Sequence, residues 1–87
     1  MDPLQDDLRN ILNIIADLAN NNTEHAVFDH AIIAESSNLP PYEIRNYLDE
    51  LKSIGLIQED NKPIGTNFRL YKITREGLNR LENQDIR

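Results

Sequence analysis

The sequence predicts a small α+β domain, with a three-helix core followed by a β-hairpin and a C-terminal helix. Two observations carry this prediction. Residues 29–57 have the pattern of two short helices, a tight turn between them and a strand directly after. Residues 56–73 have the pattern of two strands around a loop rich in turn-forming residues. The length of 87 residues is that of one domain, which is expected to span residues 1–87.

The first helix is predicted to begin near Pro3, because proline is favoured in the first turn of a helix. Apolar residues then recur at helical spacing, namely Leu4, Leu8, Ile11, Leu12, Ile15, Leu18 and Ala19, with Ile14 beside them. This stripe is interpreted as a core-facing surface, with a dimerisation surface as the alternative. Residues 20–22, all Asn, are expected to end the helix because Asn tolerates left-handed backbone conformations.

The segment after this helix, His25–Phe28, is expected to form a single strand that leads into the second helix. Two histidines, His25 and His30, lie near Glu24 and Asp29. Their spacing does not place both on one helix face, and no third cluster of ligands is present. We therefore expect no metal site and no cofactor, and a surface or half-buried place for both histidines.

A helix-turn-helix motif is predicted over residues 29–54. Asp29 is expected to cap its first helix, which runs to about Ser37. The inward residues of that helix are predicted to be Ile32, Ile33 and Ala34. Asn38 is the candidate for a left-handed residue in the turn, and Leu39 is expected to anchor the turn to the core.

The second helix of the motif is predicted to open at Pro40 and Pro41, where a missing backbone N–H has no cost. Gly55 is expected to end it in a left-handed conformation. Its inward face is predicted to be Ile44, Tyr47, Leu48, Leu51 and Ile54. Its outward face is predicted to be Tyr42, Glu43, Arg45, Asn46, Asp49, Glu50 and Lys52.

The hairpin is predicted over residues 56–73, with a loop at residues 60–67. In the return strand, Phe68 and Leu70 are expected to point one way, and Tyr71 and Ile73 the other.

The C-terminal helix is predicted over residues 75–83, with Thr74 as its cap. Leu78 and Leu81 are expected to turn inward, and residues 84–87 are expected to fray.

Composition excludes several classes of protein. There are no cysteines, so neither a disulfide nor a thiolate metal site can form. The sequence has no apolar run of membrane-spanning length, and its acidic start lacks the features of a signal peptide, so a cytoplasmic location is expected. No glycine-rich phosphate loop is present, and Ser36 and Ser37 lack the glycines of a nucleophile elbow. An enzyme is therefore not expected.

The net charge of −6 is unevenly distributed. Residues 1–40 contain seven acids and one base, whereas residues 41–87 contain eight of each. Binding to nucleic acid depends largely on Lys and Arg contacts to phosphate, so the acidic excess opposes it. Because the acidic excess lies entirely before the second helix of the motif, it opposes nucleic-acid binding less at that helix.

The segments IAESSNLPPYEIRNYLDELKSIGLI and FRLYKITREGLNRL resemble winged-helix transcription regulators of the MarR and PadR type. Leu48, Leu51, Gly55, Leu56 and Ile57 match the recognition helix, which ends in Gly-Leu-Ile. Tyr71, Ile73, Thr74 and Gly77 match the segment that enters the next helix, with Ile73 where the family has leucine. The resemblance covers roughly residues 4–83 and implies a winged helix-turn-helix domain whose wing is the hairpin.

The resemblance implies sequence-specific binding of double-stranded DNA and a role in transcription regulation. The residues of the recognition helix implied in DNA binding are Pro41, Tyr42, Arg45, Asn46 and Lys52. Those of the wing are Lys62, Asn67 and Arg69. Arg45 is expected to read guanine and Asn46 adenine, whereas Lys52 is expected to reach phosphate.

Some features depart from the family. Pro40 stands where a hydroxyl cap is usual, and three acids (Glu43, Asp49 and Glu50) share the recognition helix with two bases. An acidic winged-helix module that docks a protein partner is therefore the alternative function. The further helices of MarR-type proteins are missing, so the chain is expected to be either a homodimer through its first or last helix, or a monomer.

Overall fold

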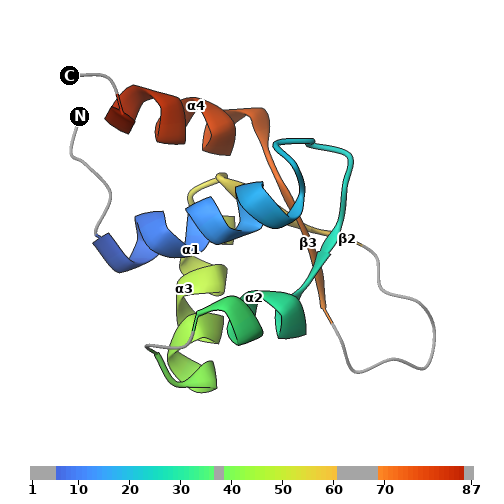
Figure 1. The fold of residues 1–87 in the computed structure, drawn as a ribbon, viewed down its shortest axis with the longest axis vertical. Helices are drawn as coiled ribbons and strands as arrows, with labels where there is room; N and C mark the ends of the chain where they lie inside the picture. Colours follow the sequence, from blue (N-terminus) through green and yellow to red (C-terminus); the bar gives the residue numbers. More distant parts are fainter. Residues whose placement is uncertain (1–5, 37–38, 61–68, 86–87) are drawn as a thin grey trace.

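The computed structural model describes residues 6–36, 39–60 and 69–85, with side chains as far as Glu82. The elements are α1 (Asp6–Leu18), β1 (Val27–Phe28), α2 (Asp29–Glu35), α3 (Pro41–Ser53), β2 (Ile57–Asp60), β3 (Leu70–Ile73) and α4 (Arg75–Asp85). In Figure 1, α1 crosses the middle of the molecule, with α4 on one side and α2 and α3 on the other. The predicted α+β class, with its helical core, hairpin strands and closing helix, is confirmed.

The apolar stripe of α1 forms the centre of the core. Its buried residues are Leu8, Ile11, Leu12, Ile15 and Ala16, followed by Ala19 directly after the helix, and Ile14 and Leu18 pack against them partly buried. The helix packs against α2, α3, α4 and β3, so most of the other elements contact it. This confirms the prediction that the stripe faces the core. Any interface between two copies through α1 would therefore use the polar residues on its outer side.

The three strands form one antiparallel sheet in the order β1-β3-β2. β3 pairs with β2 through Ile73 opposite Ile57, and with β1 through Tyr71 opposite Val27. The predicted single strand before α2 is therefore confirmed, although it is only two residues long. Tyr71 and Ile73 are buried while Leu70 is only partly so, which confirms the alternation predicted for the return strand.

Several helix ends have the predicted local cause. Asn20 and Asn21 have φ of 55° and 58°, and Gly55 has φ of 85°, so the left-handed turns after α1 and α3 are confirmed. Pro41 is the first residue of α3, as predicted. The cap of α4 is also confirmed, because Thr74 Oγ1 accepts a hydrogen bond from the Gly77 N–H at 3.1 Å.

Replacing Thr74 with Val is expected to destabilise the domain by about 1 kcal/mol, the typical cost of losing a helix cap. The hydroxyl also donates to the Gly55 carbonyl at 2.7 Å, so one side chain joins the start of α4 to the turn after α3. Urea unfolding followed by circular dichroism measures the change. Thr74→Ser retains the hydroxyl and should stay near wild type; equal losses in both variants would contradict the capping role.

Other predicted details of α2, α3 and α4 are wrong. Asp29 is the first residue of α2 rather than its cap; Phe28 holds the cap position and makes no side-chain cap bond. α2 ends at Glu35, with Ala34 exposed rather than inward. Ile54 is 49% exposed because α3 ends at Ser53, so helical spacing no longer directs this residue inward. α4 continues to Asp85, beyond the predicted end at residue 83.

Some predictions lie outside the described residues. They are the helix start near Pro3, the turn at Asn38, the hairpin loop from residue 61 to 67 and the orientation of Phe68.

Candidate nucleic-acid interface

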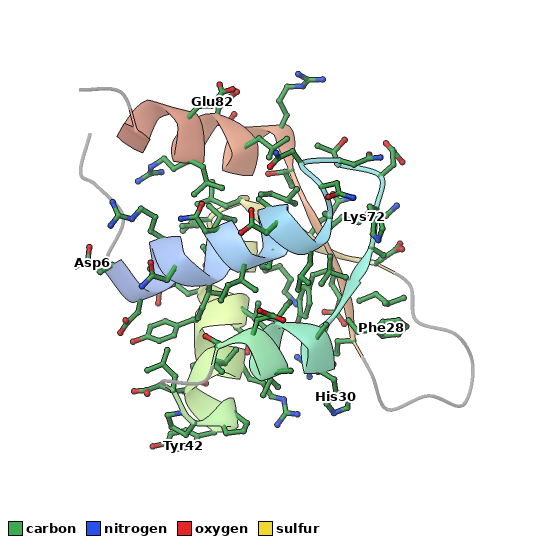
Figure 2. The ribbon with its side chains drawn as sticks, in the orientation of Figure 1. Asp6, Phe28, His30, Tyr42, Lys72 and Glu82 are labelled. Carbon is green, nitrogen blue, oxygen red and sulfur yellow. The ribbon has the colours of Figure 1, made fainter. Side chains whose placement is uncertain are left out.

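The first half of α3 forms an exposed surface. Ile44, Leu48 and Leu51 are buried and hold the inner side of the helix on the core. The outer side presents Pro41, Tyr42, Arg45 and Asn46 to solvent, as their spacing predicted. Tyr42 is 68% exposed, so most of its aromatic ring is accessible to a partner. Figure 2 shows Tyr42 and His30 on the edge of the molecule opposite Glu82 of α4, so this surface is clear of α4.

Tyr47 ties α3 to the start of α1. This residue is half-buried, and its hydroxyl donates a hydrogen bond to Asp7 Oδ2 at 3.2 Å. Desolvation, the hydrogen bond and the negative charge of Asp7 raise the pKa of the Tyr47 phenol above its ordinary value. This hydrogen bond thus joins α3 to the start of α1.

Arg45 lies beside the buried carboxylate of Asp29, which the sequence predicted to be a helix cap. Asp29 is only 3% exposed, and its Oδ2 lies 4.0 Å from Arg45 Nε. Its Oδ1 lies 3.9 Å from His30 Nδ1 and accepts no hydrogen bond within the described part of the chain. A buried negative charge under an exposed guanidinium favours one position of that group. The sequence signal was an acid directly after an apolar strand, which was interpreted only as a cap.

Lys52 is distant from the exposed residues in the first half of α3. It lies ten residues after Tyr42, which corresponds to roughly 15 Å along the axis of a helix. Its Nζ donates a hydrogen bond to Glu59 Oε1 on β2 at 3.0 Å. This hydrogen bond, together with the charge of Glu59, raises the pKa of the Lys52 ammonium above its ordinary value.

Arg69 belongs to the hairpin but lies against α3. Its NH1 group is 3.7 Å from Asp49 Oδ1, and its carbonyl accepts a hydrogen bond from the Asp29 N–H at 2.9 Å. A hydrogen bond with the Tyr71 side chain is the main cause that raises the pKa of the Arg69 guanidinium. The fold thus brings Arg69 next to α3. The other two wing residues of the prediction, Lys62 and Asn67, lie outside the described residues.

Two other kinds of site were searched for. In residues 6–36, 39–60 and 69–85, no three His, Asp or Glu side chains are grouped closely enough to hold a metal ion. Over the same ranges, no helix has both the length and the apolar character needed to cross a membrane.

Comparison with known proteins identifies the fold. No family model and no curated protein sequence match this chain. Among solved structures, a mutant MarR from E. coli complexed with operator DNA superimposes with a TM-score of 0.74 at 18% identity, over 92% of this chain and 52% of that one. A complex structure of hsRosR gives a TM-score of 0.73 at 21% identity, over 93% of this chain and 69% of that one.

A third solved structure is ZitR from Lactococcus lactis, a zinc-responsive MarR family member. It gives a TM-score of 0.72 at 17% identity, over 97% of this chain and 53% of that one. The chain therefore has the winged-helix fold of MarR-type proteins, as the sequence resemblance implied. It spans about half the length of the MarR and ZitR chains.

Proposed function

We propose that this chain is a sequence-specific DNA-binding protein that regulates transcription, with α3 as its recognition helix. The observation that carries the proposal is the exposed first half of α3, where Tyr42, Arg45 and Asn46 all face solvent. The same fold occurs in MarR of E. coli, whose structure is complexed with operator DNA. We assign the chain no enzymatic activity and place it in the cytoplasm.

The chemistry of these residues suits base recognition. An Arg can donate two hydrogen bonds to guanine O6 and N7, and an Asn can pair with adenine N6 and N7. Arg45 and Asn46 are adjacent near the exposed start of α3, where the recognition helices of helix-turn-helix proteins meet base edges. Pro41 and Tyr42 would contact the rim of the groove. We assign phosphate or minor-groove contacts to Lys52, Lys62, Asn67 and Arg69.

The charges of the chain predict weak general affinity for DNA. With a net charge of −6, long-range attraction to a polyanion is absent, and Glu43 and Glu50 on α3 must face away from phosphate. Base contacts then contribute a larger share of the binding free energy than in a basic regulator. A homodimer through α1 or α4 would present two α3 helices to two half-sites about one helical turn of DNA apart.

The test is a selection from a random duplex DNA library with the full chain at low salt, followed by fluorescence anisotropy titration of the enriched sequence. We expect one sequence family to be enriched and to bind more tightly than random DNA. The variant His25→Ala, an exposed change between α1 and β1, should bind as wild type does. The absence of both enrichment and binding would refute the proposal, and the length of the footprint would distinguish one half-site from two.

A further inference from the structure

The described basic side chains of the proposed interface are all held by carboxylates of the same chain. The pairs are Arg45 with Asp29, Lys52 with Glu59 and Arg69 with Asp49, each within 4.0 Å. They differ in how accessible the acid is. The side chain of Asp29 is 5% exposed, whereas those of Glu59 and Asp49 are 30% and 56% exposed. Only Glu59 and Asp49 are exposed enough to give up their basic partners readily to a ligand from solvent.

Both exchangeable pairs connect α3 with the strands of the hairpin. Lys52 near the end of α3 reaches Glu59 on β2, and Asp49 one turn earlier reaches Arg69, which precedes β3. A carboxylate and a DNA phosphate offer the same kind of charged oxygen acceptor to these donors. A phosphate that approaches this face must therefore compete with a carboxylate for either base.

We propose that Asp49 and Glu59 are built-in competitors of DNA phosphate, which occupy Arg69 and Lys52 and so keep binding to DNA of any sequence weak. This inference rests on the proposed DNA-binding function. Phosphate contacts supply essentially all of the affinity for DNA of unmatched sequence, so two occupied bases lower that affinity directly. The interface then engages DNA firmly only where base contacts with Arg45 and Asn46 add to the binding free energy.

The alternative role of the two pairs is structural, because they also fasten the hairpin to α3. The two roles predict different results. A purely structural pair, once broken, would leave DNA affinity unchanged or reduced. A competing pair, once its acid is neutralised, frees a base for phosphate and raises the affinity.

The experiment uses the full chain with Glu59→Gln and Asp49→Asn, and a random-sequence duplex as the probe. Glu50→Gln is the matched control, because Glu50 is an exposed acid on α3 that pairs with no base among the described residues. It removes the same charge without freeing a partner. We expect each test variant to bind roughly two- to fivefold more tightly than Glu50→Gln, in line with the modest strength of exposed ion pairs. The slope of log K against log salt should steepen by about 0.9 for each base that gains a phosphate.

A double-mutant cycle identifies the base responsible. In a chain that already has Lys52→Gln, the further change Glu59→Gln should have a clearly smaller effect than in wild type, because only Arg69, which also lies in the field of Glu59, remains to be affected. Persistence of the full effect without Lys52 would overturn the assignment. Thermal melting of every variant shows whether the fold is retained, and the Asp49 pair provides an independent test if Glu59→Gln unfolds.

The outcomes separate this inference from the proposed function. If wild type binds DNA and both acid variants behave as Glu50→Gln does, the inference fails and the proposed function stands. If wild type and all variants bind no DNA, both fail. Binding of random DNA by the acid variants alone would support both.

Discussion

Replacing Gly77 with Ala is expected to destabilise the domain by about 2–3 kcal/mol, the cost of forcing extra atoms into a packed site. In most helices this change is favourable by about 1 kcal/mol, because Ala has the higher helix propensity. Here the added Cβ would lie 2.3 Å from the Leu56 carbonyl oxygen and 2.8 Å from Ile73 Cγ1. That carbonyl already accepts a hydrogen bond from the Thr74 N–H at 3.1 Å, so moving it away would weaken this hydrogen bond. α4 would have to move away from the sheet.

Thermal and urea unfolding measure this effect, and the melting temperature should fall by roughly 10–20 °C. Asn79→Ala provides the control, because Asn79 lies on the same helix two residues later and is exposed. It should be neutral or slightly stabilising. A Gly77→Ala protein as stable as wild type would show that α4 packs less closely against Leu56 than the structure indicates.

Gly77 shows which kind of contact the sequence alone could not predict. Gly77 was noticed only as part of a family motif, because the contact with Leu56 joins residues distant in the sequence. Signals that act within a few residues were sufficient for Pro41, Gly55 and Thr74, where one backbone position determines the element boundary. The helical spacing of α1 likewise predicted its buried stripe, since a single period repeats over the whole helix.

The failures have a common physical cause. Ile54 follows the apolar spacing of α3, yet it is exposed because the helix ends one residue earlier and Leu56 takes the inward place. Asp29 has the chemistry of a cap, but the chain enters α2 with Phe28 in that position and the carboxylate lies buried beside Arg45. In both cases the position relative to a helix end decided the outcome, and helix ends are the least certain feature of a periodic pattern.

The sequence predicted the exposed residues of the candidate interface but not their ion pairs. The outward positions of Tyr42, Arg45 and Asn46 followed from the period of α3. The carboxylates that hold the bases could not be foreseen, because each pair joins different elements and depends on how those elements pack. The same packing explains how a chain with a net charge of −6 can keep these bases exposed while its own acids restrain them.

Replacing Arg45 with Ala is expected to weaken binding to the selected DNA sequence by about 1–3 kcal/mol and to relax discrimination at one base pair, if Arg45 reads guanine. The guanidinium is exposed near the start of α3, and Asp29 below it restricts its position. Titration of the enriched duplex and of single-base variants at that position measures both effects. Because the change also removes the nearest base from Asp29, the melting temperature must be recorded with each titration.

Two matched variants separate base reading from simple charge. Arg45→Lys keeps the charge but loses the planar pair of donors, so it should bind random DNA as wild type does and still lose discrimination. Lys62→Ala should weaken binding to all sequences alike and reduce the salt slope by about 0.9, as expected for a phosphate contact. If Arg45→Ala and Lys62→Ala have the same effect on every sequence, Arg45 contacts phosphate instead of a base. Recognition would then depend on Asn46 and on the shape of the duplex, since these are the other means by which a helix in the groove can distinguish sequences.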